Sequence, residues 1–301
     1  MKCVASRHYN VDIGGHVFPT VKYGLVKKRL IEKHGFSEAD FIEAQPAGDE
    51  QVLLVHTREY FEKIKFGRMT PADIMRLELP YSKELAYASF VCVGGTIKAS
   101  LLALDDGVGI HIGGGFHHAY ADHGEGFCVF NDIAVAVRYL QKEGRIKKAA
   151  VIDCDLHQGN GTAAIFAGDK DVFTFSIHQE NNYPYPKPPS NIDVGLDDGV
   201  GDEEYISCLK KHLPRIIEGH QPQFIIYVAG ADPYKGDQLG GLKLTIDGLK
   251  SRDELVLSRA KKAGVPVAVV LAGGYSIDIE DTVTNHTNTI LEAARLLGLE
   301  T

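Results

Sequence analysis

The segment Asp153-Cys154-Asp155-Leu156-His157 places three ionisable side chains at alternate positions of the chain. In extended backbone, residues two apart point to the same face, so Asp153, Asp155 and His157 are expected to project together. Two buried carboxylates this close would repel each other and carry a large desolvation cost without a cation. A divalent metal would remove that cost. We expect Asp232, from a neighbouring strand, to complete the set.

Asp155, His157 and Asp232 are therefore the candidate metal ligands. Two carboxylates neutralise a divalent ion, and three protein ligands leave a position open for water, as catalytic zinc sites require. Oxygen-rich ligation also suits Fe(II) or Mn(II). For a single Asp after a strand, a helix cap or an ion pair with Lys or Arg is the better interpretation. For the whole set, we interpret the pattern as a metal site.

The adjacent pair His117-His118 follows a triplet of glycines. A lone histidine in a loop is usually a surface or packing residue, but two beside a metal site are better read as general acid/base groups. Asp153, which is not needed as a ligand, could orient one imidazole, and Asn160 could orient the other. We assign His111 to the core and His123 to the surface.

Tyr275 follows the pair Gly273-Gly274. Glycine lets the backbone approach a site closely, and a phenol there can donate a hydrogen bond to a developing oxyanion. Ordinary packing is the better interpretation of most of the other tyrosines.

These groups must be positioned by five short apolar runs. The runs are rich in Val and Ile and mostly lack alternation, which is typical of strands buried on both faces of a parallel sheet. Glycine or polar residues follow each run at once, and ligands of such sheets bind beyond the carboxyl ends of the strands. The runs are Val108–Ile112, Ala149–Cys154, Val172–Ile177, Phe224–Ala229 and Val265–Leu271.

Helical periodicity between the runs predicts helices at Asn131–Lys142, Glu203–Glu218 and Leu249–Ala263. Earlier in the chain, Val21–His34 is expected to form an amphipathic helix and Val52–His56 an early strand. The alternation of strand and helix predicts right-handed crossovers and one doubly wound α/β domain over residues 1–301.

Composition excludes other classes of protein. The net charge of −8 argues against nucleic acid as a main partner, because phosphate binding needs a basic patch. No apolar run approaches the roughly 20 residues of a membrane helix, and the N-terminus lacks the apolar core of a signal peptide. The five cysteines are widely spaced without a CxxC, which favours a reducing cytoplasm over a disulfide framework.

Several sequence blocks resemble those of the histone deacetylase family, in the family's order. The variant HQGNG, with Gln158 and Asn160, is similar to class IV deacetylases and their bacterial relatives, and the resemblance covers nearly the whole chain. The blocks are HVFPTVKYGLV (His16–Val26), VHTREYF (Val55–Phe61), GGTIKA (Gly94–Ala99), GGGFHHA (Gly113–Ala119), GEGFCVFND (Gly124–Asp132), DCDLHQGNGT (Asp153–Thr162), AGADPYKGDQLGGL (Ala229–Leu242) and AGGY (Ala272–Tyr275).

The resemblance implies the arginase/deacetylase fold, a three-layer α/β/α domain with a mostly parallel sheet of about eight strands. It implies Zn²⁺ (or Fe²⁺) at the metal set and hydrolysis of N-acyl-lysine by metal-activated water. His118 would be the general base and then protonate the leaving amine. His117, paired with Asp153, would hold positive charge, and Tyr275 would polarise the carbonyl.

The resemblance also implies a structural K⁺ or Na⁺. Its expected site lies near Asp153, Asp155, His157, Ser176 and Ile177, partly at backbone carbonyls. A second cation site would lie near Phe166, Asp169 and Val172.

A tunnel for the acyl-lysine side chain is implied as well. Phe127 matches one wall, the Gly126 carbonyl lies beside it, and the opposite wall should come from Tyr183 or Tyr185. Leu239 stands where polyamine deacetylases of the family carry Glu, which argues against a polyamine substrate. The remaining residues expected to contact substrate are Phe116, Gly273 and Gly274.

Where class I members have His and Asp, this chain has Gln158 and Asn160. Since an uncharged Asn stabilises imidazolium less than Asp, we expect His118 to be the weaker base of the pair. Class IV relatives are associated with long fatty acyl chains, so the acyl group stays open between acetyl and longer chains.

Other functions fit the sequence less well. The runner-up is an amidohydrolase of a small N-acyl amine or natural product on the same fold. A binuclear arginase-like enzyme would need carboxylates where Gln158 and Asn160 stand. A non-catalytic acyl-lysine binder would be expected to lack His118 or Tyr275. A dinucleotide enzyme would need GxGxxG, which the triplet Gly113–Gly115 does not continue.

Overall fold

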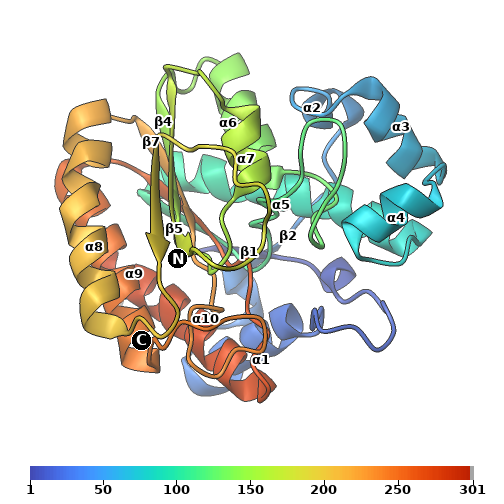
Figure 1. Ribbon diagram of the computed structural model, residues 1–301. Helices are drawn as coiled ribbons and strands as arrows, with labels where there is room; N and C mark the ends of the chain where they lie inside the picture. The colour runs from blue at the N-terminus through green and yellow to red at the C-terminus, as the bar shows by residue number, and fades with distance from the viewer. Residues whose placement is uncertain (299–301) are drawn as a thin grey trace.

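The computed structural model describes residues 1–298 and contains an eight-stranded, wholly parallel sheet (Figure 1). The strand order is β2-β1-β3-β8-β7-β4-β5-β6. The expected α/β fold with a parallel sheet of about eight strands is confirmed. The strands are β1 (Cys3–Ala5), β2 (Phe41–Glu43), β3 (Val108–His111), β4 (Ala149–Asp153), β5 (Val172–Gln179), β6 (Ile192–Leu196), β7 (Phe224–Val228) and β8 (Val267–Val270).

The five predicted runs form β3, β4, β5, β7 and β8. These five strands are neighbours in the middle of the sheet, with β2 and β1 on one side of them and β6 on the other. Almost every residue of these strands is buried, because helices cover both faces. The sequence analysis missed β1, β2 and β6. β6 is an edge strand in which exposed Asp193 and exposed Gly195 interrupt the apolar pattern.

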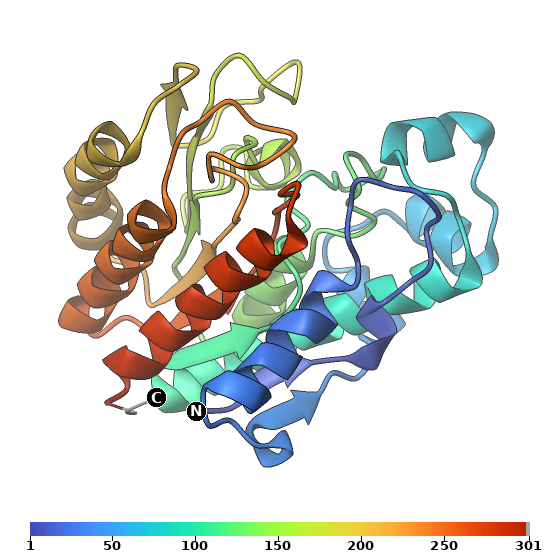
Figure 2. The same cartoon turned by 90° about the horizontal axis from the view of Figure 1, so that it is seen from below.

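Helices form a layer on each face of the sheet (Figure 2). α8, α9, α10 and α1 pack side by side in that order on one face, and α5, α6 and α7 lie on the other. The helices of these two layers are α1 (Lys22–Lys33), α5 (Lys83–Asp106), α6 (Asp132–Lys142), α7 (Asn160–Ile165), α8 (Asp202–Pro214), α9 (Ile246–Ala263) and α10 (Ile279–Leu296).

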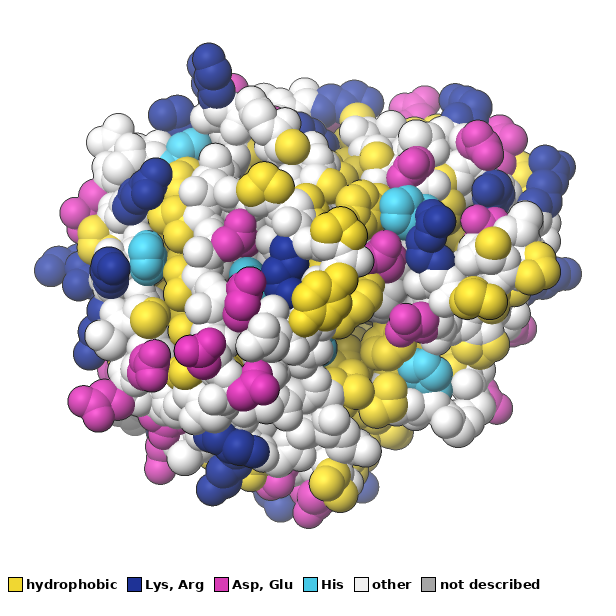
Figure 3. Space-filling view, viewed as in Figure 1, with side chains coloured by type: hydrophobic (Ala, Val, Ile, Leu, Met, Phe, Trp, Pro, Cys, Tyr) yellow, Lys and Arg dark blue, Asp and Glu magenta, His cyan; other side chains and the backbone are white. Residues whose placement is uncertain are grey.

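Three short helices, α2 (Asp49–Val52), α3 (Arg58–Phe66) and α4 (Pro71–Leu77), form a lobe beside one end of α5 (Figure 1). On the face shown in Figure 3, apolar side chains gather in a hollow between this lobe and the rest of the molecule. The predicted helix over Val21–His34 is α1, and the other three predicted helices are α6, α8 and α9.

The early strand predicted at Val52–His56 is wrong. The segment is the end of α2 followed by a turn. Its local sequence favours a helix start, since Asp49 and Glu50 occupy the first turn and the Gln51 side chain accepts a hydrogen bond from Gly48 N. Leu53 and Val55 are apolar because they pack partly against the core.

α5 is long and apolar enough to cross a membrane by length and composition alone, although polar residues interrupt its apolar sequence. Within its most apolar window, 67% of residues are buried inside the protein, as in the core helix of many folds without a membrane. Gly94 and Gly95 allow this burial. A Cβ on Gly94 would lie 1.9 Å from the carbonyl oxygen of Gln45, so only glycine fits there.

Candidate metal and catalytic centre

Asp155, His157 and Asp232 converge beyond the carboxyl ends of β4 and β7. Their nearest ligand atoms all lie within 4.8 Å of one another, and all three side chains are buried. His157 Nδ1 is 3.3 Å from Asp155 Oδ1 and 3.4 Å from Asp232 Oδ2. The spacing and the N/O ligand set are those of a divalent metal site.

The hydrogen bonding of this set also fits a metal. Asp232 Oδ2 is buried and has no hydrogen-bond donor, although its Oδ1 accepts from Leu156 N. Burial and the neighbouring Asp155 raise the pKa of Asp232 to about 6. Burial would lower the pKa of His157, but the neighbouring carboxylates of Asp155 and Asp232 raise it to about 10. Without an ion, a proton shared among these groups would have to balance the two carboxylates.

Short turns, rather than an extended strand, bring Asp155 and His157 together. β4 ends at Asp153, so the alternation argument for the segment does not hold beyond that residue. Asp153 Oδ1 accepts from Asp155 N at 3.1 Å, and Asp155 Oδ1 accepts from His157 N at 2.9 Å. These side-chain-to-backbone bonds redirect the chain at each aspartate. The Asp153 side chain consequently reaches His117 instead of the metal set.

The loop that carries His117 and His118 is held by the start of α6. Buried Asp132 accepts from Gly115 N at 3.0 Å and from Phe116 N at 2.8 Å. Asn131 caps α6 by accepting from Ala134 N and donates to Ala119 O. One helix N-terminus therefore fixes both ends of the histidine loop.

The two histidines have different partners and opposite pKa shifts. His117 Nδ1 lies 2.7 Å from Asp153 Oδ2, whereas His118 Nδ1 lies 2.7 Å from Asn160 Oδ1. Burial would lower the pKa of His117, but Asp153 and Asp155 raise it to about 9. Burial and the cationic histidines nearby hold the pKa of His118 well below its usual value. The order of basicity is the one expected from the sequence.

Tyr275 lines the same pocket as His117, His118, Asp155 and His157. Its backbone N donates to Asp237 at 2.6 Å. Lys22 is buried behind the ring and donates to the carbonyl of Ala272, which fixes the turn before Tyr275. Burial lowers the pKa of Lys22 to about 8, even though three aspartates nearby oppose the shift.

The residues expected along a tunnel are only partly brought together. Phe127, Gly126, Phe116 and Gly273 line the pocket. Tyr183 packs edge-on against His118 at 4.9 Å between ring centroids. The alternative wall residue, Tyr185, is 71% exposed and stacks with Lys187, so the structure places Tyr183 beside the site.

Gly274 and Leu239 do not line the pocket itself. Leu239 accepts a hydrogen bond from Asn182, the residue before Tyr183, through its backbone oxygen. It therefore lies next to the loop that carries Tyr183.

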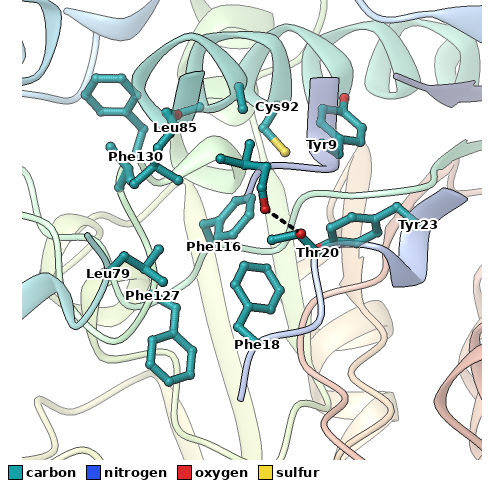
Figure 4. A pocket seen from close by; sticks show the side chains of 14 residues that line it. Tyr9, Phe18, Thr20, Tyr23, Leu79, Leu85, Cys92, Phe116, Phe127 and Phe130 are labelled. Carbon is teal, nitrogen blue, oxygen red and sulfur yellow. Dashed lines mark hydrogen bonds between the residues drawn. The ribbon is translucent and has the colours of Figure 1, made fainter. Parts of the chain in front are cut away.

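An apolar pocket adjoins the catalytic one (Figure 4). The two share Phe18, Tyr23, Phe116 and Phe127 as walls. The remaining lining is almost wholly apolar and comes from the N-terminal segment, the connection between α4 and α5, α5 itself and the loop after Phe127, with Leu79, Leu85 and Phe130 among the side chains drawn.

The groups expected to hold a monovalent cation are close in the sheet. Ser176 pairs with Asp153 in the register of β4 and β5, and the Ser176 hydroxyl contacts His178 Nδ1 at 2.9 Å. At the second expected site, the Asp169 carboxylate is engaged by Arg138 at 2.7 Å. Both cation sites stay predictions.

Three residues near the site carry roles that the sequence analysis did not assign: Lys22, Asp237 and Glu125. Each stands inside a sequence block already noted for other residues. The sequence could have indicated them only as ionisable residues within glycine- or aromatic-rich segments. The groups that they contact are shown by the fold.

Comparison with known proteins agrees with this geometry. Residues 16–290 match the histone deacetylase domain. The chain is 39% identical over 272 residues to an uncharacterized protein of Picosynechococcus sp. (90% of this chain, 91% of the relative). It is 33% identical over 286 residues to Histone deacetylase 2 of Arabidopsis thaliana (90% and 74%).

Solved structures share the fold. A crystal structure of an HDAC homolog complexed with SAHA superposes with a TM-score of 0.83 at 24% identity, covering 100% of this chain and 84% of that one. An HDAC homolog from Aquifex aeolicus gives a TM-score of 0.82, also at 24% identity with coverage of 100% and 84%.

Proposed function

Because the chain belongs to the histone deacetylase family, we propose that it is a metal-dependent hydrolase that removes an acyl group from N-acyl-lysine of a protein or peptide. One observation carries the proposal. Two of the candidate ligands, Asp155 and His157, line one pocket together with His117, His118 and Tyr275 at the carboxyl ends of the central strands, and the third ligand, Asp232, lies against the first two. The ligands, the acid/base groups and the oxyanion donor needed for amide hydrolysis are all present there.

A divalent ion at Asp155, His157 and Asp232 would act as a Lewis acid towards water and the acyl carbonyl. His118, whose lowered pKa keeps it neutral, would take the proton of the attacking water and return it to the leaving amine. His117 would stay protonated beside Asp153 and stabilise negative charge. The Tyr275 hydroxyl, whose pKa burial keeps high, would donate to the developing oxyanion.

Phe127 and Tyr183 would flank the aliphatic part of the lysine side chain. The adjoining apolar pocket offers space for acyl carbons beyond acetyl if its shared aromatic walls move. A structural K⁺ or Na⁺ near Ser176 and Ile177 is part of the proposal and rests on the resemblance. So does the assignment of Zn²⁺.

The test is a turnover screen of one peptide carrying acetyl-, medium-chain or long-chain acyl-lysine, with metal content measured on the same sample. Turnover that is lost on chelation and restored by a divalent ion is expected. Absence of stoichiometric metal, or activity that a strong chelator does not change, would contradict the proposal. Free acyl-lysine and acylated amines complete the panel, and a preference for them would favour the small-molecule amidohydrolase.

A further inference from the structure

Glu125 joins two parts of the candidate site that the proposed mechanism treats separately. It lies in the loop between β3 and α6, and its side chain is 22% exposed. Its Oε1 accepts from the side-chain amide of Asn160 at 2.6 Å and from the Tyr183 hydroxyl at 2.7 Å. Its Oε2 lies 3.4 Å from His123 Nε2. One carboxylate thus holds both the partner of His118 and the Tyr183 ring that packs against His118.

The orientation of the Asn160 amide matters for His118. An amide presents an acceptor on one side and a donor on the other, so it has two orientations with opposite effects on its partner. Here the oxygen faces His118 Nδ1 at 2.7 Å, and the nitrogen faces Glu125. An ionised carboxylate only accepts hydrogen bonds. Glu125 therefore selects the orientation that puts the amide oxygen against His118.

Glu125 is in its ionised form. Partial burial would raise its pKa, but hydrogen bonds from His123, Tyr183 and Asn160 outweigh burial and hold the pKa below its usual value. Hydrogen bonds to the charged form favour that form.

The tautomer of His118 follows from this orientation. Facing an oxygen, Nδ1 must carry the proton, so the lone pair of the neutral ring is on Nε2. His118 Nε2 points into the site, 3.1 Å from His117 Nε2. Were the amide reversed, its NH₂ group would face Nδ1. The ring proton would then favour Nε2, and the ring could not take up a proton there.

We propose that Glu125 is a positioning residue that orients the Asn160 amide and so keeps His118 in the tautomer able to act as a base at Nε2. The inference rests on the proposed function and extends it to a residue outside the reacting groups. It also accounts for the pairing of Asn160 with a carboxylate. An Asp at that position would need no orientation, since both its oxygens accept, and it would be repelled by Glu125.

The experiment is a double-mutant cycle on kcat for the acyl-lysine peptide. Glu125→Ala in the natural background is expected to lower kcat at least about tenfold, because part of the His118 population takes the wrong tautomer. In the Asn160→Asp variant, the same Glu125→Ala change is expected to raise kcat, because it removes a carboxylate facing the new one. A merely structural role for Glu125 gives a loss in both backgrounds, and that result would overturn the proposal.

Tyr183→Phe is the matched control. It removes the hydrogen bond from Tyr183 to Glu125 without touching Asn160, so its effect is expected mainly in KM. If Tyr183→Phe reproduced the whole kcat loss of Glu125→Ala, Glu125 would act through the pocket wall, and the proposal would be overturned. Thermal unfolding of each variant checks that the fold is kept.

Ring ¹⁵N NMR of His118, assigned with His118→Asn, supplies a readout independent of turnover. Glu125→Ala is expected to move the ring from the Nδ1–H towards the Nε2–H pattern, and an unchanged pattern would overturn the proposal. If the natural protein turns over no acyl-lysine peptide, the proposed function fails, while the NMR result still decides the role of Glu125.

Discussion

The two adjacent histidines have pKa values shifted in opposite directions, and their Nδ1 atoms face different partners. His117 faces a carboxylate, and His118 faces an amide. The sequence was enough to anticipate this difference, because the chain carries Asn160 where class I relatives are expected to have Asp. It was not enough to show that Glu125 and Tyr183 join the same network. Those contacts depend on a loop conformation that no local pattern encodes.

At the same scale, Tyr275→Phe is expected to lower kcat on an acyl-lysine peptide by about 10²–10³, as for the loss of one oxyanion donor. The phenyl ring keeps the packing against Phe18 and Phe127, so fold and metal content should not change. Steady-state kinetics measures the effect. Tyr139→Phe, on α6 away from the pocket, is the matched control. Turnover of the Tyr275 variant within a few-fold of the natural protein would exclude the phenol as the donor.

At the scale of elements, the turn after β8 is shaped by what its backbone must approach. Gly273 N donates to Asp155 Oδ2 at 2.9 Å, and a Cβ on Gly273 would lie 2.1 Å from Asp232 Oδ2. Side-chain atoms do not approach each other so closely, so any larger residue must displace a candidate metal ligand.

Gly273→Ala is therefore expected to weaken divalent-metal binding by more than about tenfold, a loss typical of disturbed metal ligation. Equilibrium titration of the metal-stripped protein measures it. Gly24→Ala is the control, since Gly24 lies on the exposed face of α1 with open space around its Cβ position. That variant should bind metal normally and unfold at an equal or higher temperature, because alanine favours helix. Equal metal affinity of the two variants would contradict this account.

How far the elements could be predicted depended on burial. Strands buried on both faces, such as β4 and β7, are continuous apolar runs that can be recognised in a single sequence. β1 and β2 are only three residues long, too short for any period to show. At Val52–His56 the apolar residues pack from a turn, which a strand-like composition cannot distinguish. For the candidate site, the ligands could be predicted because they follow the carboxyl ends of recognisable strands. The choice between Tyr183 and Tyr185 could not be made without the conformation of the loop that carries them.

At the scale of the whole molecule, a bound ion should contribute to stability. Without metal, the folded protein buries the two carboxylates of Asp155 and Asp232. An ion that binds only the folded chain stabilises it by about 2.7 kcal/mol when the free ion concentration is a hundred times the dissociation constant. Adding Zn²⁺ is expected to raise the unfolding temperature measured by calorimetry. Asp232→Asn should largely abolish the shift. A shift of equal size in that variant would place the ion elsewhere.

Acid stability should depend on His56, which is 2% exposed and accepts from Asn131 N. Burial lowers its pKa to about 4, with only partial opposition from the Tyr120 and Ala121 backbone. Since its ordinary pKa is about 6.5, the unfolded chain binds the extra proton as pH falls, and stability is lost between those two values.

Between about pH 7 and about pH 5 the natural protein should lose about 2 kcal/mol more unfolding free energy than His56→Gln. Urea unfolding at both values measures the difference. The glutamine oxygen can still accept from Asn131, so the comparison isolates the proton. Equal losses in the two proteins would show that His56 does not titrate differently on unfolding.

The strand order has a consequence for how the molecule assembles. β8, which comes last of the described strands in the sequence, lies between β3 and β7. Until it inserts, the group β2-β1-β3 and the group β7-β4-β5-β6 have no strand in common. His117 belongs to the first group and Asp155 to the second, so neither half can be active by itself. During synthesis the chain must keep two open sheet edges apart until its final strand arrives, and such non-local pairing is slow. The return of activity after dilution from denaturant would therefore measure the insertion of β8 between β3 and β7 rather than the early collapse of the chain.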